Sequence, residues 1–315
     1  MIRSMTLAAL ALLAPIAQAG APQQPTQAPG YYRMMLGDVE VTALSDGTVG
    51  LHVEKLLQGT TPKKVESALA KWRLGLPLET SVNGYLINTG SKLVLIDAGA
   101  GSLFGPTLGK LVANLQAAGY TTDQVDEIYI THMHPDHVGG LAADGKAVFA
   151  NAVVRADQAD ADFWLSAANL EAAPKDSKGF FQGAQASLKP YVDAGRFKPI
   201  TGDVELVPGV KAVATHGHTK GHRNYVVESQ GKKLVLWGDL MHVAAVQFAT
   251  PAVTIAFDTD QKAALAQRRK AFAEAAKGGY LIGASHLSFP GIGTLSSEGA
   301  GYRFQPTNYT TQLKR

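Results

Sequence analysis

The chain has 315 residues, and its 29 lysine and arginine residues against 26 aspartate and glutamate residues give a formal net charge of +3. The absence of cysteine excludes disulfides, thiolate nucleophiles and cysteine-ligated metal sites. The longest basic run is Arg268-Arg269-Lys270, and so short a run is typical of a solvated helix face, so nucleic acid is not an expected partner.

The N-terminal residues 1–30 are expected to lie outside the folded domain. Residues 7–17 are apolar, and Ala17-Gln18-Ala19 has the small-residue pattern of a cleavage site, so residues 1–19 are predicted to be a signal peptide. The protein is then exported, either to the periplasm or out of the cell. Residues 20–30 are rich in proline and glutamine and are expected to form a disordered leader. No later segment approaches the ~20 apolar residues of a membrane span.

Strand-like and helix-like segments alternate along the rest of the chain. Short apolar runs predict strands, and apolar residues at helical spacing predict helices. The predicted strands are 39–44, 84–88, 92–97, 127–131, 204–207, 210–214, 225–228, 234–237 and 280–284, and the predicted helices are 108–118, 157–170, 183–192 and 260–277. The last helix is capped by Asp258 or Asp260. Because no Pro/Gly-rich linker separates the halves, residues 31–315 are interpreted as one α/β domain with sheets inside and helices outside.

The strand predicted at 127–131 leads directly into a dense group of metal-competent side chains. His132 and His134 are two residues apart on an extended strand end, so they point the same way. The bend at the proline between His134 and Asp136 lets Asp136 and His137 approach from the other side. Four such groups are too many for one tetrahedral ion, so they divide into two pairs, one for each of two ions.

Three further predicted strands end close to candidate ligands. One is followed by His216, His218 and His222, and spacing alone does not say which of these binds metal. Asp239 follows another, and His286 follows the last. A carboxylate such as Asp239 has two oxygens, so it can bridge two cations and offset their charge.

The order of these ligands resembles that of the metallo-β-lactamase superfamily. The segments 30–38, 43–48, 161–165 and 286–293 further resemble the methyl parathion hydrolase subfamily and its dihydrocoumarin lactonase members, and the similarity runs from about Tyr31 to Tyr309. The resemblance implies an αββα sandwich, in which two mixed sheets are flanked by helices, with a dinuclear metal site on one edge of the sheets.

The resemblance also implies the ligand sets. One ion would take His132, His134 and His218, the other would take Asp136, His137 and His286, and Asp239 and a hydroxide would bridge both. Asp97 and His222 are expected to support the ligands through hydrogen bonds. Zinc is the expected metal, while manganese, cobalt and iron also suit histidine and aspartate.

Two ions roughly 3.5–4 Å apart lower the pKa of a shared water toward neutrality, so the bridging hydroxide beside Asp239 and Asp136 is the expected nucleophile. The resemblance implies that the substrate pocket is lined by Leu56, Phe104, Trp164, Phe181, His242 and Phe257. His242 and Phe257 should narrow this pocket, so that a planar aryl lactone fits better than a bulkier tetrahedral phosphotriester.

The sequence therefore predicts a dinuclear metallohydrolase that opens aryl lactones and esters of the dihydrocoumarin type, with organophosphate triesters as a side activity. A dedicated organophosphate hydrolase of the methyl parathion hydrolase kind is the nearest alternative. An acyl-homoserine-lactone hydrolase shares the ligands, although the flanking segments match it less well. From another class, the chain could be an exported zinc-binding protein without catalysis. The hydrophobic content of 46% allows a homodimer without locating its face.

Overall fold

The computed structural model describes residues 21–313, and the predicted signal peptide at 1–19 lies outside them. Residues 21–29 are exposed and form no helix or strand, and disorder in this leader stays a prediction. Gly30 belongs to the folded part, because its N–H donates to Asn114 Oδ1 (2.8 Å) and its carbonyl accepts from the Ser45 N–H (2.8 Å).

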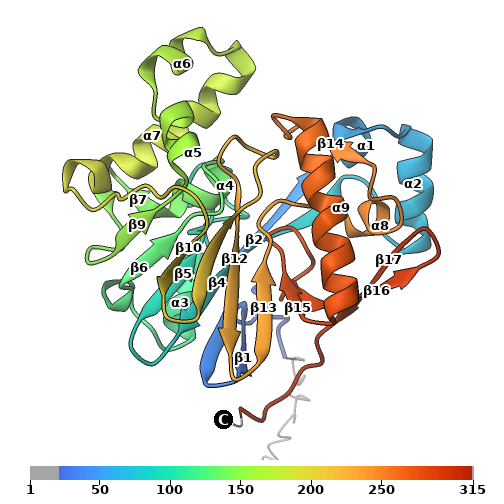
Figure 1. Cartoon of the computed structure of the whole chain (residues 1–315), viewed down its shortest axis with the longest axis horizontal. Coiled ribbons are helices and arrows are strands. Elements are labelled where there is room, and N and C mark those ends of the chain that lie inside the picture. The colour runs from blue at the N-terminus through green and yellow to red at the C-terminus, as the bar shows by residue number, and fades with distance from the viewer. Residues whose placement is uncertain (1–20, 314–315) are drawn as a thin grey trace, which may run out of the picture.

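Two mixed sheets form the centre of the molecule (Figure 1). The first has the spatial order β1 (Tyr31–Leu36), β2 (Val39–Leu51), β4 (Leu78–Asn88), β5 (Leu93–Ile96), β6 (Glu127–Tyr129) and β9 (Val153–Arg155). The second has the order β10 (Val204–Val207), β11 (Val210–Ala214), β12 (Arg223–Ser229), β13 (Lys232–Leu236), β15 (Leu281–Gly283), β16 (Ile292–Glu298) and β17 (Gly301–Pro306). Two short ribbons pair β3 (Leu57–Gln58) with β14 (Thr254–Ile255) and β7 (Ala142–Ala143) with β8 (Lys146–Ala147).

Helices flank the two sheets. On one side lie α3 (Leu111–Ala117), α4 (Pro135–Val138), α5 (Gln158–Trp164), α6 (Ala167–Ala172) and α7 (Lys178–Asp193), and on the other lie α1 (Val53–Leu56), α2 (Pro62–Lys71), α8 (Ala244–Gln247) and α9 (Gln261–Gly278) (Figure 1). Short 3₁₀ turns occur at Thr122–Gln124, Gly139–Leu141 and Lys175–Ser177. Among residues 21–313, no helix is both long and apolar enough to cross a membrane.

The layering follows from the alternation of side chains along the central strands. In β5, Leu95 packs with helices α3, α5 and α7, whereas its neighbours Val94 and Ile96 pack against the second sheet. In β13, Leu234 faces the first sheet and Val235 packs against α9. Successive residues of a strand point to opposite faces, so a strand covered on both faces must be apolar throughout. The αββα sandwich predicted from the sequence is confirmed.

Two of the predicted helices differ from those observed. The helix predicted at 157–170 is two helices, α5 and α6, because the chain turns between them and the Ser166 hydroxyl caps α6 by accepting from the Asn169 N–H (3.2 Å). The helix predicted at 183–192 is the later part of α7, which already begins at Lys178. This earlier start brings additional aromatic residues onto a helix that borders the functional site.

The buried carboxylate of Asp46 organises the loop between β5 and α3. It accepts hydrogen bonds from the backbone N–H groups of Ala100 (2.9 Å), Gly109 (3.0 Å) and Leu111 (3.0 Å). Gly109 has a φ of 77°, a left-handed conformation that favours glycine, so the helix predicted from residue 108 begins only at Leu111. Asp46 thereby fixes both ends of a loop that reaches the functional site.

Replacing this carboxylate should destabilise the fold. Asp46→Ala leaves backbone donors at Ala100 and Leu111 buried without a partner, and we expect a loss of about 3 kcal/mol or more in the free energy of unfolding. Urea denaturation at constant metal content measures it. Asp38→Ala, at an exposed aspartate, is the matched control and should change stability by only about 0.5 kcal/mol. Equal losses in the two variants would show that Asp46 does not hold the loop.

Candidate metal centre

The candidate ligands predicted from the sequence lie together at one edge of the sheets. Their ligand atoms form two groups whose members lie within 4.8 Å of one another: His132, His134, His218 and Asp239, and Asp136, His137, Asp239 and His286. These are the two sets implied by the resemblance, with Asp239 in both. The grouping supports a centre for two divalent ions.

Strand direction explains why residues so far apart in sequence meet. Asp239 and His286 follow β13 and β15, which are parallel neighbours and therefore end at the same edge of the sheet. The strand before His218, β11, runs in the same direction as β13, since each is antiparallel to β12. His132 follows β6 of the other sheet. The carboxyl ends of strands from both sheets thus supply the centre.

In the first group the imidazole nitrogens approach one another closely. His134 Nδ1 lies 2.9 Å from His132 Nε2 and 3.1 Å from His218 Nε2. Asp239 Oδ2 lies 3.3 Å from His218 Nε2 and 3.6 Å from His132 Nε2. All four residues are buried. Three nitrogens and one oxygen make a four-ligand set of the kind that zinc binds.

The second group contains two carboxylates. His137 Nε2 lies 3.4 Å from Asp239 Oδ1 and 3.5 Å from Asp136 Oδ2. His286 Nε2 lies 3.1 Å from Asp239 Oδ2 and 3.5 Å from Asp136 Oδ2. The side chain of Asp136 is 18% exposed, so this group is the more open one.

The hydrogen bonds around the ligands leave lone pairs that face one another. In three of the histidines Nδ1 lies beside a buried oxygen acceptor: His137 beside Asp97 Oδ2 (2.8 Å), His218 beside Asp258 Oδ1 (2.8 Å), and His286 beside the Ser81 carbonyl (2.9 Å). Each Nδ1 therefore carries a proton, so Nε2 is the nitrogen that each of these rings would offer to a metal ion. His137 Nε2 and Asp239 Oδ1 are buried without a hydrogen-bond partner. Nitrogen and oxygen atoms that face one another without hydrogens between them repel unless a cation lies between them. The nitrogen and carboxylate ligands of these two groups fit two divalent ions.

The protonation states suit the same role. Burial lowers the pKa of His132 and of His134 well below the usual value, so both rings are neutral and keep a lone pair for a metal. Burial of Asp239 favours the neutral acid, but the imidazoles led by His286 and His137 outweigh this and hold the pKa of Asp239 well below its usual range. Asp239 is therefore an anion that can offset the charge of two ions.

Asp97 supports the ligand loop, as expected from the sequence. One oxygen contacts His137 Nδ1 (2.8 Å) and accepts from the Thr131 hydroxyl (2.8 Å), while the other accepts from the Thr131 N–H (2.8 Å). Asp97 itself has a φ of 59°, in the left-handed region that aspartate tolerates better than most residues. One carboxylate thus orients a candidate ligand and the strand end that leads to the others.

The two remaining histidines of the second cluster differ in role. His222 Nε2 accepts from the Asp239 N–H (3.0 Å), and its Nδ1 pairs with Thr215 Oγ1 (2.9 Å), so the ring holds the backbone of Asp239, the candidate bridging residue. His216 Nε2 pairs with Asp157 Oδ2 (3.0 Å), outside both ligand groups. Spacing did not show which of His216, His218 and His222 binds metal. In the structure, only His218 of these three belongs to a candidate ligand group.

Sequence reasoning missed a buried ion pair behind His218. Asp258 contacts His218 through Oδ1, and its Oδ2 lies 3.4 Å from Arg268 Nη2. Arg268 is fully buried and also donates to the carbonyls of Leu240 (2.5 Å) and Val253 (2.7 Å), so the expectation that the basic run is a solvated face is wrong at this residue. The carboxylate of Asp260 caps α9 by accepting from the N–H of Ala263, so Asp258 is free for His218.

A second missed residue, Asp160 of α5, joins the two histidine loops. Its carboxylate accepts from the Met133 N–H (3.0 Å) in the first loop, and from the Gly221 N–H (2.6 Å) and the Thr219 hydroxyl (2.9 Å) in the second. Burial raises the pKa of Asp160 to about 6. No local sequence signal distinguishes it from a surface aspartate on a helix.

A cavity of about 210 Å³, here called the inner cavity, opens directly on the candidate metal centre. Its apolar walls come from strands of the first sheet, the loop after β5, α7 and the loop after β14. It is lined by Val49, Leu51, Val82, Phe104, Leu108, His134, Asp136, Phe180, Asp239, His242, Phe257 and His286. The predicted pocket residues Phe104, His242 and Phe257 are among them.

Three predicted pocket residues do not line this cavity. Phe181 is buried in the core with its ring 4.7 Å from that of Trp164, and Trp164 lies edge-on to the His134 ring at 5.2 Å. Leu56 packs against the cluster formed by α1, α2 and α8. Phe180 lines the cavity instead, because consecutive helical residues point in directions about 100° apart.

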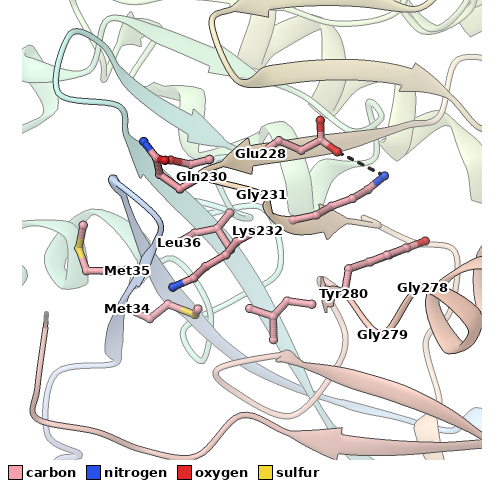
Figure 2. A pocket seen from close by; sticks show the side chains of 13 residues that line it. Met34, Met35, Leu36, Glu228, Gln230, Gly231, Lys232, Gly278, Gly279 and Tyr280 are labelled. Carbon is pink, nitrogen blue, oxygen red and sulfur yellow. Dashed lines mark ion pairs between the residues drawn. The ribbon is translucent and has the colours of Figure 1, made fainter. Parts of the chain in front are cut away.

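A wider surface pocket, about 870 Å³, lies elsewhere. Figure 2 shows its lining, which includes Lys232 and the ion pair between Glu228 and Lys233 (3.6 Å). Lys232 begins β13, whereas Asp239 follows the end of the same strand. The pocket therefore lies at the opposite edge of the second sheet from the candidate ligands, and its lining contains no histidine.

Removing the carboxylate behind His218 should weaken metal binding. The neighbouring carboxylates of Asp239 and Asp258 outweigh burial and raise the pKa of His218 to about 9, so Asp258 makes this ring a stronger base and orients it. Asp258→Asn should lower the affinity for zinc about 10–100-fold, measured by competition with a chelator. Asp260→Asn, two residues away and exposed, is the control. An unchanged affinity in Asp258→Asn would show that His218 needs no such partner.

Known proteins with a similar chain share this architecture. The metallo-beta-lactamase superfamily profile matches residues 78–286. A solved hydrolase of the beta lactamase superfamily, AbOPH, has a TM-score of 0.86 at 38% identity, over 90% of this chain and 100% of that one. AidC, a dizinc quorum-quenching lactonase solved in complex with a product, has a TM-score of 0.83 at 26% identity, over 90% of this chain and 99% of that one.

Curated relatives at the sequence level are lactonases. An N-acyl homoserine lactonase of Bacillus cereus is 30% identical over 128 residues, which are 40% of this chain and 42% of that protein. One of Bacillus thuringiensis is 27% identical over 191 residues, which are 55% of this chain and 67% of that protein. The match thus spans less than half the length of the first of these relatives. The profile match over residues 78–286 shows that the chain belongs to the metallo-beta-lactamase superfamily.

Proposed function

We propose that this protein is a metal-dependent hydrolase that opens lactones. The observation that carries the proposal is the inner cavity, whose mainly apolar wall ends on Asp136, Asp239 and His286. When bound, two divalent ions would supply a water of lowered pKa and would polarise a carbonyl oxygen. A zinc-binding protein without catalysis would have no use for an apolar cavity that opens on its ions.

The residues around the cavity select an uncharged substrate. Phe104, Phe180 and Phe257 line the cavity beside the candidate ligands and make its wall apolar, which strengthens electrostatic interactions inside. The lining includes no lysine or arginine, so a negatively charged substituent against the apolar wall would be left without a partner. The walls therefore favour a neutral lactone or ester over an anionic one.

The finer proposal is an aryl lactone of the dihydrocoumarin type, with slower hydrolysis of organophosphate triesters. His242 Nε2 lies 3.1 Å from Asp239 Oδ2, and the Phe257 ring lies 6.1 Å from that of His242, so both narrow the cavity beside the bridging residue. Its volume of about 210 Å³ lies below the ~300–1,000 Å³ of most ligand pockets. A flat ring fits such a space better than three substituents around phosphorus. The lactonase relatives favour N-acyl homoserine lactones as a second candidate.

Rates on dihydrocoumarin, N-hexanoyl homoserine lactone and methyl parathion, measured on one zinc-loaded preparation, test the proposal. We expect kcat/KM to be highest on a lactone. In the double variant His242→Leu and Phe257→Leu, the ratio of phosphotriester to lactone kcat/KM should rise about tenfold or more, because the two flat rings beside Asp239 are replaced by flexible aliphatic side chains. Leu56→Ala, outside the cavity, is the control. No turnover of any lactone would refute the function, and an unchanged ratio would refute the role of the two side chains.

We also propose that the chain is exported, because an apolar segment and Ala17-Gln18-Ala19 precede the folded domain. Expression of the full chain in a Gram-negative host tests this. The protein recovered from the periplasm should begin at Gly20, and a protein that keeps Met1 and stays in the cytoplasm would contradict export.

A further inference from the structure

Two large apolar side chains are exposed at the C-terminal end of α2, a helix at the periphery of the molecule (Figure 1). Trp72 follows the last residue of α2 and is 50% exposed, and Leu74 is 43% exposed. The other two tryptophans of the chain, Trp164 and Trp237, are buried, as is usual for so large a side chain. Neighbouring apolar side chains that face water mark a surface that something else covers.

A hydrogen-bonded turn presents these two side chains. The Leu74 N–H donates to the Leu69 carbonyl (3.0 Å), and the Arg73 N–H donates to the Ala70 carbonyl (3.1 Å). This pair of bonds ends a helix when the residue after its cap is left-handed, and Arg73 has a φ of 59°. Glycine is usual at this position, because a side chain there is strained. An arginine that stays in a strained conformation indicates a use for its side chain.

Positive charge is concentrated around the same turn. Residues 55–77 contain five lysine or arginine residues against one acidic residue, whereas the rest of the chain carries nearly equal numbers of both. The five are exposed: Lys55, Lys63, Lys64, Lys71 and Arg73. Within residues 21–313, none of them forms an ion pair. These cations are therefore available to a negatively charged partner.

The basic side of α2 points away from the core. Val65 and Leu69 are buried in an apolar cluster that α2 shares with α1 and α8. Lys64 and Lys71 are seven residues, or about two turns, apart, so they share a face on the solvent side of the helix. Phe257, which lines the inner cavity, packs against the same cluster. The basic surface is thus built on the same cluster as one wall of the inner cavity.

We propose that residues 62–74, that is α2 and the turn after it, bind the surface of a membrane that contains anionic lipids. The lysines contact lipid phosphates, and Trp72 and Leu74 enter the boundary between headgroups and acyl chains, where tryptophan is favoured. A lipid surface supplies negative charge and an apolar layer side by side, whereas nucleic acid would leave Leu74 exposed. This inference does not depend on the proposed function.

Tryptophan fluorescence tests the contact, because Trp72 is the one exposed tryptophan of the chain. With vesicles of phosphatidylcholine and roughly 30% phosphatidylglycerol, we expect its emission to move to shorter wavelength and to be quenched by brominated lipids. Trp72→Phe should lose this change. Vesicles of phosphatidylcholine alone, or high salt, should abolish it. An emission that anionic vesicles leave unchanged would overturn the proposal.

Charge reversal tests which surface binds. In the double variant Lys64→Glu and Lys71→Glu, partition to anionic vesicles, measured by sedimentation, should fall about 25-fold or more, since each cation near such a surface contributes about fivefold. Lys262→Glu with Arg269→Glu, an exposed pair also seven residues apart on α9, is the matched control and should keep most of the binding. All variants keep the apolar residues 7–17, so the comparison isolates α2. Equal losses in the two double variants would overturn the proposal.

A glycine at position 73 separates binding from stability. Arg73→Gly should unfold at a higher urea concentration, because the strain is relieved, while its partition to anionic vesicles falls about fivefold. An unchanged partition would contradict the use inferred for Arg73. A natural chain that sediments as a dimer and a Trp72→Ala variant that sediments as a monomer would also overturn the proposal, because a second copy would then cover this surface.

Discussion

The structure depends on the arrangement of lone pairs that face one another in a buried space. Seven side chains present nitrogen or carboxylate oxygen atoms to common centres, and acceptors so placed repel one another unless cations lie between them. The fold imposes this arrangement by holding the outer nitrogen of each of three rings. Asp97, Asp258 and the Ser81 carbonyl hold Nδ1 of His137, His218 and His286, so that Nε2 of each ring points inward. Metal binding then becomes part of the free energy of folding.

Two packed sheets give these side chains the rigid support that they need. The ligands follow strands that are buried on both faces, and a ligand set must be held to within a fraction of an ångström. Asp160 adds a connection that the sheets do not provide, since it joins the first histidine loop, through Met133, to the second, through Thr219 and Gly221. The two halves of the molecule therefore meet both at their sheet faces and at the ligand loops.

The fold class, the candidate ligands and two residues that support them could be predicted from the sequence, because the ligand motifs are dense and resemble those of a known superfamily. The group from His132 to His137 packs metal-competent side chains into a turn, and few other chemistries need that density. The residues that line the inner cavity have no comparable pattern in the sequence. The resemblance alone implied Phe181 as a pocket residue, and because the sequence predicted α7 only from residue 183, no helical phase was available to show that Phe180 faces the inner cavity.

The burial of Arg268 could have been predicted from helical periodicity, but its positive charge favoured an exposed position. It lies four residues after Ala264 and three before Ala271, on the buried face of α9, and helical periodicity alone would have placed it there. The charge of the basic run suggested a solvated face instead, since an arginine is rarely buried unless it is paired. Its partner Asp258 and the carbonyls that it contacts come together only in three dimensions.

The candidate metal ligands and the walls of the inner cavity come from different parts of the chain, and this separation affects how substrate specificity is set. Asp239 and His286 follow central strands, whereas Phe104, Phe180 and Phe257 come from a loop, a peripheral helix and the segment after β14. Substitutions in these outer elements can reshape the inner cavity without moving a candidate ligand. A superfamily that keeps one metal centre can in this way serve different substrates, because binding and activation rest on separate parts of the chain.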